Sequence, residues 1–254
     1  MKKQLARYGT IFLTALLISA CGGGQNAVSA GGGAEIPEEI LGELDEETLK
    51  ELVEEPKYVA LTFDDGPRAD TTGWLLEQLE LREVPATFFM VGRRIPGNED
   101  LIRQMKEQGC QVGVHTYDHV DVTGLSQADF DQQIGKTRTL LREILGEEAF
   151  WLRPPYGFVD EGVRAWSDGP IILWSVDPED WKDHNAARIA AAVTEQVKDG
   201  DIILLHDIYH SSVDAAVQIV DELLRRGFCF VTVEDLLAWK GISPESGAVY
   251  RSGR

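Results

Sequence analysis

The run Tyr58-Val59-Ala60-Leu61-Thr62-Phe63-Asp64-Asp65-Gly66-Pro67 joins a short apolar segment to two adjacent carboxylates and a Gly-Pro turn. Further apolar runs follow along the chain and alternate with helix-like segments. This alternation indicates parallel strands, and continuous apolar runs are typical of a sheet that is buried on both faces. The predicted strands cover residues 58–63, 86–91, 111–115, 150–153, 171–175, 202–206 and 229–233. We therefore predict an α/β fold in which about seven parallel strands close as a barrel, smaller than the eight-stranded form.

Four predicted helices between these strands have recognisable ends. Asn or Ser begins each helix and Gly ends it, as expected for side-chain N-caps and left-handed C-caps. The flanking pairs are Asn98 and Gly109, Ser126 and Gly146, Asn185 and Gly200, and Ser212 and Gly227.

The first 21 residues have the layout of a secretory signal. A basic start precedes the apolar run 11–20, which is far shorter than the roughly 20 residues that span a bilayer. The sequence Ile18-Ser19-Ala20-Cys21 resembles a bacterial lipobox, which implies a diacylated Cys21, and two acyl chains anchor a protein stably. The alternative is a plain secretory signal with an incidental cysteine. We expect an exported protein, anchored by lipid on the outer face of the bacterial cell membrane.

The rest of the chain divides by composition into three parts. Residues 22–55 form a Gly-rich tether followed by an acidic segment, 56–240 form the folded domain, and 241–254 form a C-terminal tail. Two interpretations are open for the acidic residues 35–55, which either pack on the domain as a short amphipathic helix or belong to a stalk.

Charge and cysteine content restrict the possible partners. The formal net charge is −19 and no basic patch is available to neutralise phosphates, which argues against a nucleic-acid partner. We expect a monomer. Beyond Cys21 the chain has Cys110 and Cys229, each at the start of a predicted strand. In an exported protein they could pair or remain two buried thiols, and the sequence leaves both possibilities open.

Polar side chains gather where the predicted strands end. In α/β barrels the carboxyl ends of the strands build the active site. A shared mouth is therefore expected for side chains that would each be weak evidence alone. These are Asp64, Asp65, His115, His119, Arg153, Asp177, Asp180 and His206. His184 and His210 lie in polar loops and are expected at the surface.

The spacing of two histidines points to a metal site. His115 and His119 are four residues apart, a common spacing of metal ligands, although an isolated pair is more often one capping and one surface histidine. Asp65 can complete a facial set of two imidazoles and one carboxylate, which leaves positions open for water and substrate. Ligand type favours one Zn²⁺, with Co²⁺, Ni²⁺ or Fe²⁺ as alternatives.

Five motifs in register resemble those of the NodB-type polysaccharide deacetylases, carbohydrate esterase family four. The similarity covers about residues 56–240. One departure is Val120, where the family often has Pro after the second histidine. The motifs are Thr62-Phe63-Asp64-Asp65-Gly66-Pro67, His115-Thr116-Tyr117-Asp118-His119, Arg153-Pro154-Pro155-Tyr156-Gly157, Asp177-Pro178-Glu179-Asp180-Trp181 and Leu204-Leu205-His206-Asp207.

The resemblance implies a distorted barrel and a single divalent metal. Asp65, His115 and His119 resemble the metal ligands of the family. Asp64 resembles the general base, and Arg153 the residue that holds it.

The same resemblance implies the remaining roles. His206 resembles the general acid, tuned by Asp180, and only the resemblance favours Asp180 over the nearby Asp177. The backbone N–H of Tyr156 is similar to the oxyanion donor of the family, and Trp181 and Leu204 to the walls of the pocket for the acetyl methyl.

The expected function is metal-dependent hydrolysis of N-acetyl groups from N-acetylglucosamine of a cell-wall polysaccharide, most simply peptidoglycan, with release of acetate. A lipid anchor would hold the enzyme beside that polymer. The alternatives are chitin-like oligomers, an exopolysaccharide or acetylxylan as the substrate. A surface glycan-binding protein with a retired active site is a third interpretation, and the presence of every expected catalytic residue argues against it.

Overall fold

A computed structural model of the chain describes residues 56–147 and 149–254. The predictions for the signal segment, Cys21, the tether and the acidic residues 35–55 lie outside the described residues. No helix in the described part is long and apolar enough to cross a membrane. The unit described below is Lys57–Arg254.

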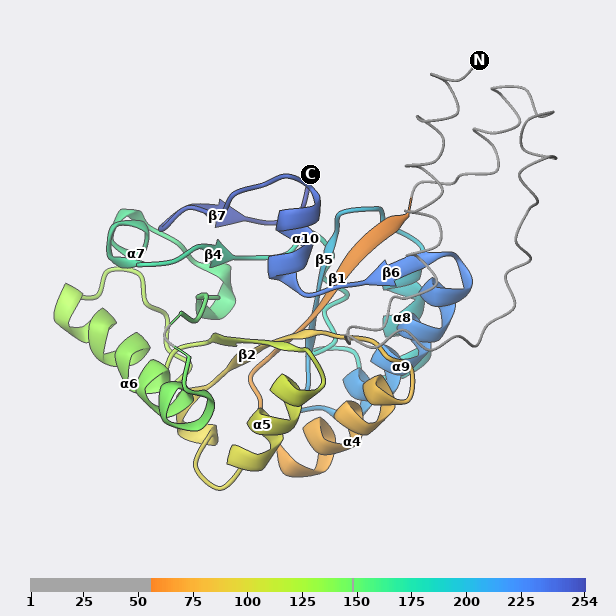
Figure 1. Cartoon of the computed structure of the whole chain (residues 1–254), viewed down its shortest axis with the longest axis horizontal. Helices are drawn as coiled ribbons and strands as arrows, with labels where there is room; N and C mark the ends of the chain where they lie inside the picture. The colour runs from red at the N-terminus through yellow and green to blue at the C-terminus, as the bar shows by residue number, and fades with distance from the viewer. Residues whose placement is uncertain (1–55, 148) are drawn as a thin grey trace, which may run out of the picture. The chain divides into compact units, whose positions relative to one another are not determined.

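Parallel strands form the centre of this domain, which confirms the predicted α/β class (Figure 1). Strand β1 has β2 and β5 as neighbours, β3 extends the sheet beyond β2, and β6 pairs with the first residues of β1. A second small sheet pairs β4 with β7. The strands are β1 Lys57–Asp64, β2 Thr87–Met90, β3 Gln111–Val114, β4 Ile171–Ile172, β5 Ile202–His206, β6 Phe228–Phe230 and β7 Val249–Tyr250.

Single-residue parallel bridges connect the two sheets into a distorted ring. Leu152 bridges Val114 of β3 on one side and Ile171 of β4 on the other. Val176 then bridges Ile203 of β5, which already pairs with β1. The barrel therefore exists as a circuit of strands and bridges rather than as a continuous ladder.

Two of the predicted strands are wrong in their extent, and one short strand was not predicted. Residues 150–153 pair only through Leu152, because Pro154 and Pro155 follow directly and have no backbone N–H to extend the pairing. The strand predicted at 229–233 ends at Phe230, and Thr232 is instead the N-cap of a helix. Residues 241–254, expected as a tail, contribute β7.

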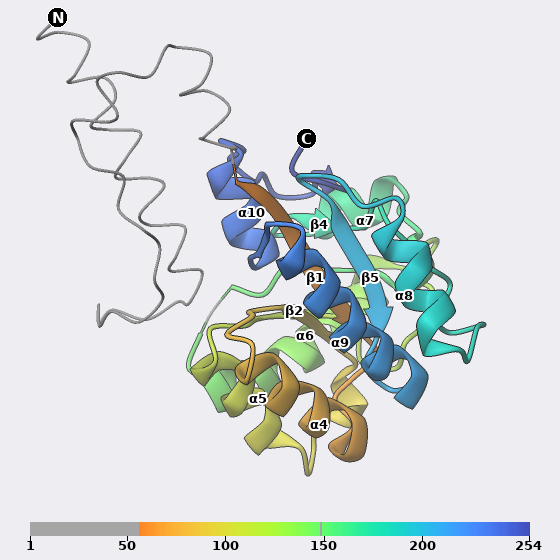
Figure 2. The same cartoon turned by 90° about the vertical axis from the view of Figure 1, so that its right-hand side faces the viewer.

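Helices lie around the outside of the strands (Figures 1 and 2). The four predicted helices are present as α5, α6, α8 and α9, and α6 has the expected caps: the Ser126 side chain accepts from the Asp129 N–H, and Gly146 is left-handed. Within residues 56–254, three helices of the described part were not predicted: α4, α7 and α10. The bounds are α4 Ala69–Glu80, α5 Glu99–Glu107, α6 Gln127–Leu145, α7 Glu161–Trp166, α8 Ala186–Thr194, α9 His210–Arg225 and α10 Val233–Trp239, with 3₁₀ turns η1 Gly92–Arg94 and η2 Pro155–Gly157.

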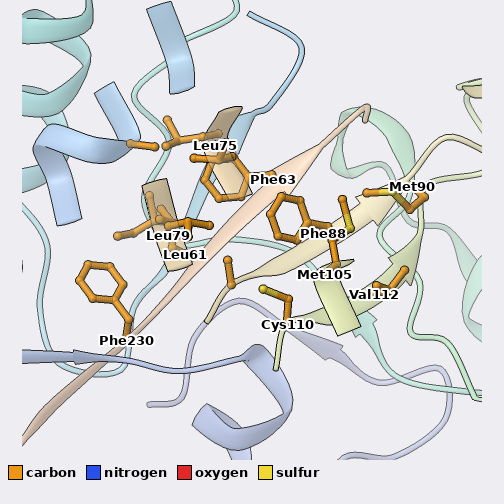
Figure 3. Close-up of a cluster of buried hydrophobic side chains, with 14 of the residues drawn as sticks. Leu61, Phe63, Leu75, Leu79, Phe88, Met90, Met105, Cys110, Val112 and Phe230 are labelled. Carbon is orange, nitrogen blue, oxygen red and sulfur yellow. The ribbon is translucent and has the colours of Figure 1, made fainter. Parts of the chain in front are cut away.

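The alternation of side chains along β1 separates the core from the site. Leu61 and Phe63 are fully buried in the cluster formed with the outer helices, where Figure 3 shows them beside Leu75 and Leu79. Successive side chains of a strand point to opposite faces, so Thr62 and Asp64 point the other way, into the barrel. The apolar residues of β1 thus fix the direction of its polar ones.

The buried cysteines do not form a bond with each other. Cys110 is a buried free thiol, and Cys229 is also buried. Burial raises the pKa of the Cys110 thiol to about 11, so this side chain is packed as a neutral apolar group.

Candidate active site

The carboxyl ends of the strands bring the predicted site residues to one rim. Asp64 ends β1 and His206 ends β5, and these two residues are direct partners in the parallel register. His115 directly follows β3, and Arg153 directly follows the bridging residue Leu152. The predicted mouth at the strand ends is therefore present.

Three of the predicted residues could hold a metal ion. The potential ligand atoms of Asp65, His115 and His119 all lie within 4.8 Å of one another. The Asp65 Oδ1 atom is 3.1 Å from the His119 Nε2 and 3.6 Å from the His115 Nε2. Two imidazoles and one carboxylate form a set that suits a divalent transition metal.

The surroundings of these residues fit a cation. His115 Nδ1 lies 2.6 Å from the Arg153 carbonyl oxygen, an acceptor that fixes the proton on Nδ1 and leaves the Nε2 lone pair facing Asp65. The Asp65 Oδ1 atom is buried and has no hydrogen-bond partner among the described residues. A buried carboxylate oxygen without a donor is costly, and a bound cation would compensate it.

Arg153 holds Asp64 at the bottom of the site. Both side chains are buried, and the Arg153 Nη1 atom donates to the Asp64 Oδ1 at 2.8 Å and to the Thr62 hydroxyl at 2.7 Å. Its other nitrogens donate to the carbonyls of Ile172 and Leu173. Burial lowers the pKa of the Arg153 guanidinium, whereas the charge of Asp64 opposes that shift. Asp64 is thus an oriented carboxylate with one oxygen left to act on a substrate.

Asp180, rather than Asp177, is the partner of His206. One Asp180 oxygen lies 2.8 Å from the His206 Nδ1 and the other accepts from the His206 backbone N–H. The exposed Asp177 carboxylate instead accepts from the Glu179 N–H. Burial lowers the pKa of His206, but the hydrogen bond and charge of Asp180, with Asp64 and Asp65, outweigh it and raise the pKa to about 9. A protonated imidazole therefore faces the site at neutral pH.

Strained backbone is concentrated in the motifs. Asp65, His119 and Tyr156 have positive φ angles of 76°, 58° and 62°. Thr116 and Glu179, next to His115 and Asp180, are also positive. Conformations that non-glycine residues rarely adopt persist only where the surroundings enforce them, which is typical of functional sites.

The predicted substrate residues differ in exposure. Tyr156 is 58% exposed and its ring lies 5.1 Å from that of His119, so its side chain borders the metal ligands. Trp181 is 51% exposed, whereas Leu204 is buried. His184 and His210 are exposed, as expected.

Two residues around the first motif were not assigned a role from the sequence. Asp207 is fully buried and accepts a hydrogen bond from the Thr72 hydroxyl. Burial raises the pKa of Asp207 to about 7 despite that hydrogen bond. Asp207 is the last residue of the fifth motif, whereas nothing in the sequence distinguished Thr72 from the other threonines of the chain.

Known proteins share this domain. The family model described as polysaccharide deacetylase matches residues 52–167. The peptidoglycan-N-acetylmuramic acid deacetylase PdaC of Bacillus subtilis is 40% identical over 180 residues, 71% of this chain and 38% of that protein. A peptidoglycan-N-acetylglucosamine deacetylase of Bacillus cereus is 32% identical over 198 residues, 75% of this chain and 92% of that protein. The chain spans 38% and 40% of the length of the first curated relatives it matches.

A solved structure extends the similarity to three dimensions. A family 4 acetyl xylan esterase from Clostridium thermocellum, in complex with a cobalt ion, superposes with a TM-score of 0.73 at 32% identity. The match covers 77% of this chain and 98% of that chain.

Proposed function

The chain belongs to the polysaccharide deacetylase family, and from that premise we propose that it removes N-acetyl groups from N-acetylglucosamine of peptidoglycan and releases acetate. One observation carries the proposal. An Arg-held carboxylate, a set of three metal-binding side chains and a protonated His–Asp pair share a single rim. Amide hydrolysis needs a base, an electrophile and an acid in this arrangement.

The side chains divide the reaction between them. A divalent metal held by Asp65, His115 and His119 would polarise the acetyl carbonyl and make water more acidic. Asp64, fixed by Arg153, accepts the proton of the water that attacks the carbonyl carbon. The Tyr156 N–H donates to the oxyanion that forms. As the carbon–nitrogen bond breaks, His206 gives its proton to the departing sugar amine, and acetate leaves.

The metal in this proposal is Zn²⁺. Neutral imidazole nitrogens and one carboxylate suit Zn²⁺, and Co²⁺, Ni²⁺ and Fe²⁺ accept the same ligands. The related acetyl xylan esterase with a cobalt ion supports a divalent transition metal of this group. Elemental analysis of the purified chain would identify the native ion.

The identity of the glycan substrate is proposed from the relatives. Relatives are named for N-acetylmuramic acid and N-acetylglucosamine of peptidoglycan, for chitooligosaccharides and for acetyl xylan. Relatives that are 40% and 38% identical are named as peptidoglycan deacetylases, which favours the cell wall. Acetate release from purified wall, chitooligosaccharide, exopolysaccharide and acetylxylan separates these substrates. If acetate is released from acetylxylan alone, the enzyme hydrolyses acetyl esters and the proposed amide hydrolysis is wrong.

The proposed location of the enzyme is based on the lipobox-like sequence around Cys21. We propose that Cys21 is diacylated and holds a monomeric enzyme on the outer face of the bacterial cell membrane, beside its substrate. Metabolic labelling with a fatty-acid analogue should mark the wild-type chain and not Cys21→Ser. Equal labelling of both chains would contradict the anchor.

The catalytic test uses Asp64→Asn. The amide keeps the shape of the carboxylate but does not accept a proton, so acetate release from wall should fall by about 100-fold or more. Metal content should be retained, because the proposed ligands are unchanged. Asp177→Asn is the matched control, since Asp177 is an exposed carboxylate of the same family motifs and accepts a hydrogen bond from the Glu179 N–H. Wild-type turnover by Asp64→Asn would refute the proposed base.

A further inference from the structure

We propose that Asp207 is a positioning residue, which fixes the segment that carries Asp65 directly after β1 against the segment that directly follows His206 at the end of β5. The inference rests on the proposed function, because it assigns Asp207 to the geometry between the base and the acid. Asp207 itself has no route to a substrate, since its side chain is fully buried beneath the rim. We call its contacts with Gly66 and Thr72 the Asp207 bridge.

The first contact of the bridge is close packing against Gly66. A methyl group placed on Gly66 would lie 2.7 Å from the Asp207 Cγ and would overlap both carboxylate oxygens. Gly66 directly follows Asp65. The absence of a side chain at Gly66 therefore allows the Asp207 carboxylate to lie against the backbone next to a proposed metal ligand.

The second contact is a relay through Thr72. The Thr72 hydroxyl donates to the Asp207 Oδ2 and accepts from the Arg68 backbone N–H. This single hydroxyl thus joins the loop after β1, the first turn of α4 and the segment after β5. The bond from Arg68 is local, four residues apart in sequence, whereas the bond to Asp207 connects segments that are distant in sequence.

A third contact joins the same two segments at the surface. The Arg68 guanidinium donates to the Ile208 carbonyl oxygen at 2.9 Å. Residues 66–72 and 207–208 are therefore connected at three points, although some 140 residues separate them in sequence. These three contacts restrict how the two segments can move relative to each other.

That relative position matters for the chemistry. Asp64 and His206 must act on opposite sides of one scissile bond, and small misplacements of reacting groups lower rates strongly. Asp65 is also held with a φ of 76°, which persists only if its neighbours are fixed. Asp207 directly follows His206 in the sequence, and it packs against Gly66, which directly follows Asp65. It is therefore placed to set both.

Neighbouring threonines of α4 provide a matched test. Thr72→Val removes the hydroxyl of the bridge, and Thr71→Val removes a hydroxyl that is equally buried but has no hydrogen-bond partner in the described part of the chain. Both changes conserve shape, so a general effect of burying a valine in α4 appears in both. Asp207→Ala removes the carboxylate, and Asp207→Asn retains its shape and an acceptor for Thr72.

Each full-length variant is measured by turnover and by spectroscopy. The kcat and KM for acetate release are determined on Zn²⁺-loaded chain, together with the melting temperature. The visible absorption of Co²⁺-loaded chain reports the arrangement of the metal ligands without any turnover. We expect Thr72→Val and Asp207→Ala to lower kcat by about 10-fold or more at nearly unchanged KM and to alter the Co²⁺ spectrum. Thr71→Val should match wild type, and Asp207→Asn should recover most of the loss.

The outcomes separate this inference from the proposed function. Equal kcat and equal spectra for Thr72→Val and Thr71→Val would overturn the positioning role, as would an Asp207→Asn variant as impaired as Asp207→Ala. A fall in melting temperature without a change in kcat or spectrum would also overturn it, since the bridge would then be structural alone. If wild type releases no acetate from any glycan, the proposed function fails, and the Co²⁺ spectra still decide whether the bridge positions Asp65.

Discussion

Replacing Asp180 by Asn should lower the pKa of His206 and remove activity on the alkaline side. In the structure the Asp180 carboxylate bonds both the Nδ1 atom and the backbone N–H of His206. An amide has one acceptor oxygen. If the Asn oxygen accepts from the His206 backbone N–H, the NH₂ group of the same amide faces the His206 Nδ1 and favours the neutral imidazole. The general acid of the proposed mechanism would then lack its proton.

The size of the effect follows from the charges around His206. Its pKa is 6.5 without the protein and about 9 in the fold, where burial lowers it and Asp180, Asp64 and Asp65 raise it more. At about 1.4 kcal/mol per pH unit, this difference corresponds to about 3 kcal/mol in favour of the imidazolium. Without Asp180 the largest opposing contribution, burial, remains, so the pKa should fall by about 2 units or more.

The sign determines the pH window of stability. Because the pKa of His206 is raised on folding, its contribution is complete below pH 6.5 and is lost as the pH rises through about 9. Urea unfolding of metal-free chain at both pH values should reveal this loss in wild type, once other titrations common to both proteins are subtracted. The loss should be absent from Asp180→Asn.

Kinetics give an independent measurement. A bound cation near His206 would itself lower the pKa, so the alkaline limb of kcat/KM for the metal-loaded enzyme should lie below pH 9. Asp180→Asn should shift this limb to lower pH by more than about 1 unit, whereas Asp177→Asn, in the same motif, should leave it unchanged. An unshifted limb in Asp180→Asn would refute the assignment of Asp180 as the partner that keeps His206 protonated.

Two further predictions concern stability. Arg153→Met leaves the buried Asp64 without its counter-charge and should reduce the unfolding free energy by about 3–5 kcal/mol in urea titrations. Arg82→Met breaks the more exposed pair with Asp221 and should reduce it by no more than about 1 kcal/mol. Equal losses in the two variants would contradict the role of burial. Zn²⁺ at 100 times its Kd should raise the unfolding free energy by about 2.7 kcal/mol, and this gain should disappear in His119→Ala if His119 is a ligand.

Much of the fold was predictable because its signals are local. Continuous apolar runs identified β1, β2, β3 and β5 nearly to the residue, and Ser126 with Gly146 located both ends of α6. Burial on both faces of a parallel sheet imposes these runs, and helix ends need particular capping residues wherever they occur.

Helix α4 was not predictable for the opposite reason. Its first five residues include Thr71, Thr72 and Gly73, which are poor helix formers, and its N-cap residue Arg68 makes no side-chain cap hydrogen bond. Thr72 is buried and donates a hydrogen bond to Asp207, which lies far away in the sequence. Tertiary packing therefore outweighs local propensity in this segment.

By itself the sequence determined the positions of β1, β2, β3 and β5, the five motifs and the candidate ligands Asp65, His115 and His119, because each is a short pattern of residue types. Only the tertiary structure decided that Asp180 and not Asp177 contacts His206, and that Asp207 accepts a hydrogen bond from Thr72 of α4. Asp177 and Asp180 are the same residue type in one motif, so the sequence does not distinguish them. They differ physically in what the folded chain brings within hydrogen-bond distance, and residues 26 or 135 positions apart meet only in the fold.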